Sequence, residues 1–223
     1  MQYFIVGLGN PGTEYENTRH NTGAMVLETF RKAEDLPEWS EDKKRKALIS
    51  EGSLSSSPPR LRRGAEGGVV GTRNQKVLLI LPQTFMNESG KALKNLQLTT
   101  KNLQQGKKKI KEITNLVVIH DDLDIPFGKY KISFNKSSGG HHGVESIMKA
   151  VKTEAFVRVR VGIASSASAV KKSQEEKAVE KIILGKFTPA ELLEFKKLAK
   201  YIAEGLHCLI TESREKAMSQ YHA

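Results

Sequence analysis

Short apolar runs alternate with longer polar stretches along this chain. Three of them, residues 3–6, 77–81 and 116–119, stop abruptly in polar clusters. Short, continuous apolar runs bounded by turn residues are typical of buried strands. Residues 156–161 alternate apolar and polar, which predicts a strand with one solvated face. Weaker patterns predict three further strands, at residues 47–49, 69–72 and 129–134.

Helical spacing of apolar residues appears between the strands. It predicts helices over residues 24–35, from Ser89 through 91–98, from Gly143 to 151, and from 188 to about 204. The last has a typical start, because Thr188 can cap the helix, Pro189 fits its first position and Glu191 its first turn. Strands alternating with helices predict an α/β fold: a single-domain three-layer sandwich over residues 1–223, with a mixed, mostly parallel sheet flanked by helices. Ser-, Pro- and Gly-rich residues 53–68 are expected to form a mobile insertion.

Composition narrows the class of protein. Lys and Arg number 36 against 25 acidic residues, a net charge of +11 that suits an anionic partner or a solubilising surface equally well. Aromatic residues, at 6%, are too few for a single-strand stacking platform. No apolar run reaches the roughly 20 residues of a membrane helix, so no membrane partner is expected. A single cysteine, Cys208, and the absence of a charged leader before residue 3 favour a cytoplasmic protein.

Polar residues follow three of the predicted strands. Asn10 comes after the first, Asn87 after residues 77–81 and Asp121 after residues 116–119. The carboxyl ends of parallel strands line one edge of a sheet, where ligands bind. If these strands are neighbours, the three side chains converge on one crevice.

The spacing Gly7-x-Gly9-x-x-Gly12 formally matches a dinucleotide-binding loop. Such a loop needs a helix that starts at once behind the third glycine. Here Pro11 interrupts the loop, residues 13–19 carry no apolar face, and no acidic residue ends a second strand at the required distance. The pattern therefore disfavours a nicotinamide or flavin cofactor, and no cofactor is expected.

His20 precedes the first predicted helix, and Asp121 is the natural acid to orient its ring. No serine or cysteine stands in a nucleophile-elbow motif, so a His20–Asp121 pair would activate water directly. The amides of Asn10 and Asn87 could hold a carbonyl or the developing oxyanion. A competing hypothesis is a zinc or manganese site, although adjacent residues cannot all face one ion. Its candidate ligands are His120, Asp121, Asp122, Asp124, His141 and His142.

A glycine-rich segment, residues 139–143, precedes the third predicted helix. Its backbone amides could bind an anion, or it could serve as the hinge of a lid. Basic side chains nearby make a phosphate-bearing substrate plausible, with a solvated basic face as the alternative. They are Lys129, Lys131, Lys136, Arg158 and Arg160.

Five blocks of sequence together resemble the bacterial-type peptidyl-tRNA hydrolases, in that family's order. They are Gly7-Leu8-Gly9-Asn10-Pro11-Gly12 with Tyr15, Thr18-Arg19-His20-Asn21-Thr22-Gly23, Pro82-Gln83-Thr84-Phe85-Met86-Asn87-Glu88-Ser89-Gly90, His120-Asp121-Asp122-Leu123-Asp124, and Gly139-Gly140-His141-His142-Gly143. The resemblance implies a monomeric, metal-independent esterase that cleaves the ester between a peptide and the 3′ ribose of tRNA.

The resemblance also implies roles for single residues. His20 matches the general base and Asp121 the acid that orients it, while Asn10 matches the residue that senses the first peptide bond. Positions that contact the acylated end of the tRNA are matched by Tyr15, Phe85 and Asn87, with Met86 in the wall between them. Arg160 matches a basic position for the tRNA 5′ phosphate.

Two positions depart from the family pattern. His142 stands where the family usually has an asparagine that helps to place water and the tRNA end, and an imidazole lacks the amide's paired donor and acceptor. Ser133 stands near a position that is often lysine, for which Lys131 or Lys136 could substitute. The change at His142 motivates a second hypothesis, an RNA-binding relative with weak or no hydrolase activity.

Overall fold

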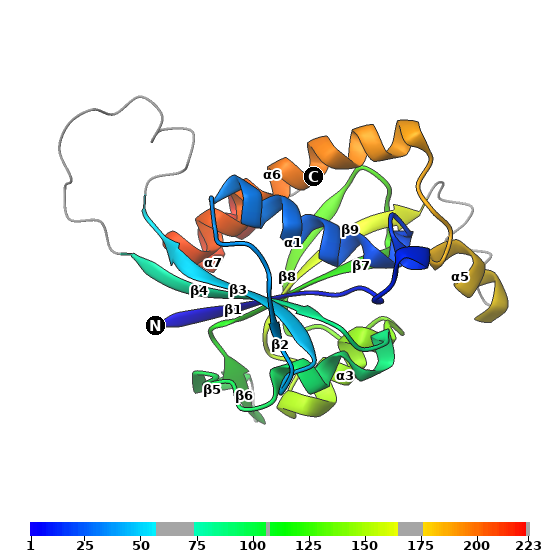
Figure 1. Ribbon diagram of the computed structural model, residues 1–223. Coiled ribbons are helices and arrows are strands. Elements are labelled where there is room, and N and C mark those ends of the chain that lie inside the picture. Colours follow the sequence, from blue (N-terminus) through cyan, green and yellow to red (C-terminus); the bar gives the residue numbers. More distant parts are fainter. Residues whose placement is uncertain (57–73, 106–107, 165–175, 222–223) are drawn as a thin grey trace, which may run out of the picture.

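The computed structural model describes residues 1–56, 74–105, 108–164 and 176–221 (Figure 1). Its main sheet has the strand order β2-β3-β4-β1-β7-β9-β8. The four strands β4, β1, β7 and β9 are mutually parallel, while β2, β3 and β8 are antiparallel to their neighbours. The strands are β1 (Gln2–Gly7), β2 (Ser40–Asp42), β3 (Ala47–Leu54), β4 (Gln75–Pro82), β7 (Leu116–Pro126), β8 (Tyr130–Phe134) and β9 (Val157–Ala164).

Helices cover both faces of this sheet, which confirms the predicted α/β sandwich (Figure 1). One face carries α1 (Thr22–Ala33), α6 (Pro189–Thr211) and α7 (Arg214–Gln220). The other carries the 3₁₀ helix η3 (Met86–Leu93) and α3 (His142–Val151). Helix α5 (Glu176–Ile183) precedes α6, and the short 3₁₀ turns η1 (Thr13–Tyr15) and η2 (Arg19–Asn21) lie between β1 and α1. None of the described helices is both long and apolar enough to cross a membrane.

The alternation of side chains along the central strands creates two cores. In β1, Ile5 packs with α1 and α6, whereas Phe4 and Val6 pack with η3 and α3. Burial on both sides explains why these strands appear in the sequence as continuous apolar runs. The predicted start of α6 is confirmed, because Thr188 and Glu191 form a reciprocal capping box.

Some predicted elements are wrong. The helix expected over residues 91–98 is instead η3, which begins earlier and stops at Leu93, and Asn95 then adopts a left-handed φ of 61°. The Lys- and Gln-rich stretch after η3, for which the sequence predicts no helix or strand, forms a hairpin of β5 (Thr100–Gln105) and β6 (Lys108–Ile113). Lysine and glutamine dominate these strands, so the usual β-branched signal is missing.

The solvated face expected for β9 is also absent. This strand lies between β7 and β8, so all its residues are buried except Arg160, which is half-buried. The strand expected at 69–72 lies outside the described residues. So do residues 57–68 of the expected insertion, while Ser53 and Leu54 at its start belong to β3.

Candidate active site

Polar segments follow β1 and β4, and Asp121 lies beside them within β7, just past Ile119, where the pairing of β7 with β1 stops although the strand itself continues to Pro126. These strands are direct neighbours, with Val6 of β1 in register with Ile80 of β4 and with Val118 of β7. Because the three strands are parallel, their carboxyl ends point to the same edge of the sheet. The predicted convergence of Asn10, Asn87 and Asp121 required these strands to be neighbours, and that condition is confirmed.

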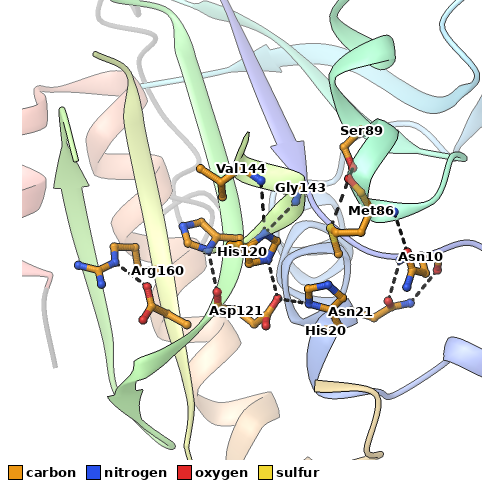
Figure 2. A network of polar contacts seen from close by, with 12 residues as sticks. Asn10, His20, Asn21, Met86, Ser89, His120, Asp121, Gly143, Val144 and Arg160 are labelled. Carbon is orange, nitrogen blue, oxygen red and sulfur yellow. Dashed lines mark hydrogen bonds and ion pairs between the residues drawn. The ribbon is translucent and has the colours of Figure 1, made fainter. Parts of the chain in front are cut away.

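A close approach between helix and sheet places His20. The backbone amide of Ala24 donates to Leu8 O at 3.0 Å, and the amide of Leu8 donates to Ile119 O at 3.0 Å. A Cβ atom on Gly23 would lie 2.2 Å from Ile119 O, so only glycine permits this contact. The turn η2 is thereby held against β7 beside Ile119, and the His20 ring meets Asp121 (Figure 2).

His20 and Asp121 form a buried hydrogen bond, with 2.9 Å between Nδ1 and Oδ1. Burial alone would raise the pKa of Asp121, but His20 and His141 outweigh it and hold that pKa far below its usual value. Asp121 is therefore ionised at neutral pH and accepts a hydrogen bond from His20 Nδ1–H. Burial lowers the pKa of His20, but the charge and hydrogen bond of Asp121 raise it more, above 6.5 overall. The Nε2 atom remains to accept a proton.

His141 is a second histidine on the same carboxylate. Its Nε2 lies 2.9 Å from Asp121 Oδ1, and its Nδ1 accepts the backbone amides of Gly143 at 3.1 Å and Val144 at 3.3 Å. Because Nδ1 faces two donors, the proton of the neutral ring must be on Nε2, which donates to Asp121. Sequence reasoning placed His141 only among metal or anion ligands, although its position before a helix was a signal for capping.

His120 is the third histidine of this cluster. Its Nδ1 donates to the backbone oxygen of Asp121 at 2.7 Å, and its ring centroid lies 4.8 Å from that of His141. Full burial, together with the proximity of His141 and Arg158, lowers the pKa of His120 well below 6.5. This histidine is neutral and does not compete for the carboxylate side chain.

One group in the described part of the chain has metal-ligand spacing, namely His20, Asp121 and His141, whose ligand atoms lie within 4.8 Å of one another. A metal ligand needs a free lone pair on the nitrogen that faces the ion. His141 cannot offer one at Nε2 without placing its proton on Nδ1, against the amides of Gly143 and Val144. The donor pattern therefore fits a hydrogen-bonded cluster and not a metal site.

The same two amides bear on the predicted anion site of residues 139–143. Gly139 and Gly140 adopt positive φ angles of 64° and 80°, which turn the chain so that His141 caps α3. The amides of Gly143 and Val144 are thus already paired with a side chain. The expected anion-binding role of this segment is wrong for these two groups.

Asn10 is held in one orientation. Its Oδ1 accepts the backbone amide of Met86 at 2.8 Å, and its backbone exchanges two hydrogen bonds with the Asn21 side chain. Since Oδ1 is occupied by a donor, the Nδ2 group is directed elsewhere and has no partner among the described residues. It is a fixed donor available to a carbonyl oxygen (Figure 2).

The loop that follows β4 presents three further predicted residues. Phe85 is 60% exposed, while Met86 is buried and contacts Gly143, where a Cβ would lie 2.4 Å from its sulfur. Asn87 is exposed and makes no hydrogen bond with the described residues. Tyr15, at the end of η1, is half-buried. The structure thus brings Asn10 to this loop but gives no contact that joins Asn87 or Tyr15 to His20.

Arg160 lies beside the site, in register with His120. It donates to Asp122 Oδ2 at 2.7 Å, and Figure 2 shows it on the opposite side of Asp121 from Asn10. Arg158 is only 1% exposed and donates to Ser137 O, so the expectation that it contacts a phosphate is wrong. The side chain of His142 is 65% exposed, outside the cluster of His20, Asp121 and His141. Ser133 is buried in β8, opposite Arg158.

A buried carboxylate hydrogen-bonded to a histidine, near the carboxyl ends of parallel strands in an α/β fold, is an arrangement that can activate water. The family model for peptidyl-tRNA hydrolase matches residues 4–223. The peptidyl-tRNA hydrolase of Carboxydothermus hydrogenoformans is 34% identical over 220 residues, 99% of this chain and 98% of that protein. That of Aquifex aeolicus is 34% identical over 206 residues, 92% of this chain and 87% of that protein.

Comparison with a solved structure points to the same family. The crystal structure of peptidyl-tRNA hydrolase from Acinetobacter baumannii matches with a TM-score of 0.74 and 25% identity, over 99% of this chain and 94% of that chain. The chain belongs to the peptidyl-tRNA hydrolase family, whose members are hydrolases acting on an ester bond.

Proposed function

We propose that this protein hydrolyses the ester that joins a peptide to the 3′ ribose of tRNA, and that His20 is its general base. The observation that carries the proposal is the hydrogen bond of His20 Nδ1 to ionised Asp121, which leaves Nε2 to take a proton from water. Of the described residues, no serine or cysteine makes a hydrogen bond with His20. Water is therefore the nucleophile.

The reaction follows from this assignment. The water oxygen attacks the ester carbonyl carbon while its proton passes to His20 Nε2, and Asp121 stabilises the imidazolium that forms. The tetrahedral intermediate then collapses, the bond to the ribose 3′ oxygen breaks, and His20 returns its proton to that oxygen. The products are tRNA with a free 3′ hydroxyl and a peptide carboxylic acid, which ionises to the carboxylate by releasing its proton to solvent. The donor pattern of His141 supports a route that is independent of metal.

Asn10 supplies recognition next to the base. The Met86 amide holds Asn10 Oδ1 and so fixes the orientation of the carboxamide. The Nδ2 group then donates to the carbonyl of the first peptide bond. A free aminoacyl group lacks that carbonyl, so N-blocked substrates are preferred. The amide of Asn87, exposed one residue beyond Met86, adds a second donor for the ester carbonyl.

The remaining predicted residues are assigned to the nucleic acid. Exposed Phe85 offers a face for the terminal adenine, with Tyr15 as a second contact and Met86 as the wall between substrate and core. Arg160, with Lys131 opposite it on β8, holds the 5′ phosphate, and His142 lies beside the tRNA end. We further propose that the chain acts as one domain, as a monomer, and in the cytoplasm.

The test is hydrolysis of an N-acetyl-aminoacyl-tRNA and of its unblocked counterpart, both in excess chelator. The proposal expects cleavage of the blocked species only. Equal cleavage of both would contradict the role of Asn10, and cleavage that needs added metal would contradict the metal-independent route. Binding of tRNA without cleavage would favour the RNA-binding alternative.

A further inference from the structure

The turn η2, which carries His20, is tied to the segment between α5 and α6 (Figure 1). The backbone amide of Arg19 donates to Gly185 O at 3.0 Å, and the amide of Phe187 donates to Asn17 O at 2.9 Å. These two hydrogen bonds join stretches of chain that are far apart in the sequence. They do so immediately before His20.

The side chain of Arg19 extends this connection. Its Nη2 donates to Glu191 Oε1 at 2.7 Å, and its Cζ atom lies 4.7 Å from the centroid of the Phe187 ring. Phe187 is buried and stacks on Phe195 of α6, with 5.3 Å between the ring centroids. The guanidinium is thus held between a carboxylate and the face of a core aromatic ring, so it makes an ion pair and a cation–π contact together.

Glu191 is itself fixed to the start of α6. Its Oε2 accepts the backbone amide of Thr188 at 2.8 Å, so one carboxylate caps the helix with one oxygen and binds Arg19 with the other. Burial alone would raise the pKa of Glu191, but the hydrogen bonds of Arg19 and Thr188 outweigh it and hold that pKa below its usual value. The ion pair is therefore intact at neutral pH, and it anchors η2 to a helix of 23 residues.

We infer that Arg19, through its ion pair with Glu191, is a positioning residue that holds the His20 imidazole against Asp121, an inference that rests on the proposed function. The close contact of Gly23 with β7 holds the side of the turn that follows His20. Arg19 directly precedes His20, so its pair with Glu191 holds the other side. Both sides matter because a displacement of about 1 Å in a reacting group can cost on the order of 100-fold in rate.

The test uses two variants and a matched control. Arg19→Gln removes the cation. Glu191→Gln removes the anion, but its amide oxygen can still accept the Thr188 amide, so the cap of α6 is kept. The control is Asp42→Asn, because Asp42 also accepts a backbone amide with one oxygen and an arginine side chain, that of Arg45, with the other. Asp42 lies on the edge strand β2, which three strands separate from β7.

The inference expects kcat for N-acetyl-aminoacyl-tRNA to fall by about 10- to 100-fold in Arg19→Gln and Glu191→Gln, with KM within about twofold of wild type. Arg19→Lys keeps the charge and should lose less than Arg19→Gln. In a His20→Ala background, Arg19→Gln should change the residual turnover by less than about twofold, because it has no base left to position. A kcat in Arg19→Gln equal to that of Asp42→Asn overturns the inference, as does a full loss in the His20→Ala background or an equal loss in Arg19→Lys.

The pKa of His20, followed by NMR titration of its ring, is a readout that a purely structural role would not move. Burial lowers this pKa and Asp121 raises it more, so a His20 released from Asp121 titrates at lower pH. The direct charge effects of the two substitutions have opposite signs, since loss of the Arg19 cation raises the pKa and loss of the Glu191 anion lowers it. A fall in both variants, absent from the control, therefore reports a change of geometry. An unchanged or raised pKa in Arg19→Gln overturns the inference.

The titration also separates this inference from the proposed function, because it needs no turnover. If the wild-type protein does not cleave the ester, the proposed function fails, and the pKa of His20 in the two variants still decides whether Arg19 positions it. Circular dichroism checks that each variant is folded. If Arg19→Gln does not fold, Glu191→Gln carries the test, and an unchanged kcat or an unchanged His20 pKa in that variant overturns the inference.

Discussion

His20 and His141 hydrogen-bond the same oxygen, Asp121 Oδ1, each at 2.9 Å, and their ring centroids lie 4.9 Å apart. They approach it with different ring nitrogens, Nδ1 for His20 and Nε2 for His141. The amides of Gly143 and Val144 occupy His141 Nδ1, so His141 reaches the carboxylate as a donor through Nε2. The cluster therefore joins one carboxylate to two histidines, and we propose that His20 is the base among them.

Asp121→Asn should reduce kcat/KM for N-acetyl-aminoacyl-tRNA by about 10²- to 10⁴-fold. The amide keeps the shape of the carboxylate but cannot stabilise the imidazolium, and it can present a donor to His20 Nδ1. Steady-state kinetics measure the loss, and thermal unfolding followed by circular dichroism checks that the variant is folded. A loss smaller than about fivefold would argue that Asp121 does not orient the base.

The dependence of kcat/KM on pH should show an acidic limb whose midpoint lies above 6.5, because Asp121 raises the pKa of His20 more than burial lowers it. His20 must be neutral to accept a proton, so activity falls as the pH drops through this pKa. Asp121→Asn removes the raising effect and leaves burial, so the limb of the residual activity moves below 6.5. An unchanged limb in that variant would assign it to another group.

His141→Phe should shift the acidic limb of kcat/KM against pH to higher pH. Without the Nε2–H of His141, the Asp121 carboxylate interacts more strongly with His20 and raises its pKa further. The substitution also removes the cap of α3, which costs about 1 kcal/mol in the free energy of unfolding. Ser213→Ala at the start of α7, another capping residue, serves as a control that has the cap effect without the pH shift.

His142→Asn, which restores the family's usual residue, should change kcat/KM by no more than about threefold, as expected for a surface substitution worth about 0.5 kcal/mol. The His142 side chain is 65% exposed, and its nearest charged partner is Glu145 at 3.7 Å. Kinetics with full-length substrate provide the measurement. A sharp gain in activity would make His142 a defect and favour the RNA-binding alternative.

Stability should depend on a second buried pair far from the site, in which His207 Nδ1 of α6 meets Glu34 Oε1 at the end of α1 at 2.9 Å. His207→Ala should lower the free energy of unfolding by about 3 kcal/mol, because it breaks a buried pair. Urea unfolding tests this, with exposed Lys200→Ala as the control. The turnover of the folded variant should equal that of the wild type.

The strands and the sandwich were predictable because β1, β4 and β7 are buried on both faces and so appear as uninterrupted apolar runs. Asp121 and Asn10 were predictable from the same pattern, as polar residues that follow apolar runs, although β7 continues past Asp121 to Pro126. The hairpin of β5 and β6 was not, since Lys- and Gln-rich strands outside the main sheet carry no apolar alternation. The burial of Arg158 depends on β8 pairing beside β9, a relation between distant segments that local pattern does not contain.

The role of His141 was also beyond local pattern. Its sequence neighbours suggest glycine-rich flexibility, whereas its function in the cluster requires the φ angles of Gly139 and Gly140 and the approach of α3 to β7. His20 and Asp121 are 101 residues apart, and their contact depends on Gly23 fitting against Ile119 O. The polar cluster that follows the apolar run 116–119 made Asp121 the candidate partner of His20, and the sequence resemblance implied the same pair.

The most direct test of the central claim is the turnover of His20→Ala with N-acetyl-aminoacyl-tRNA, measured beside the wild type in chelator. We predict a loss of at least about 100-fold in kcat, with tRNA binding and the thermal unfolding midpoint close to those of the wild type. Turnover near the wild-type rate in the folded variant would contradict the assignment of His20 as the base.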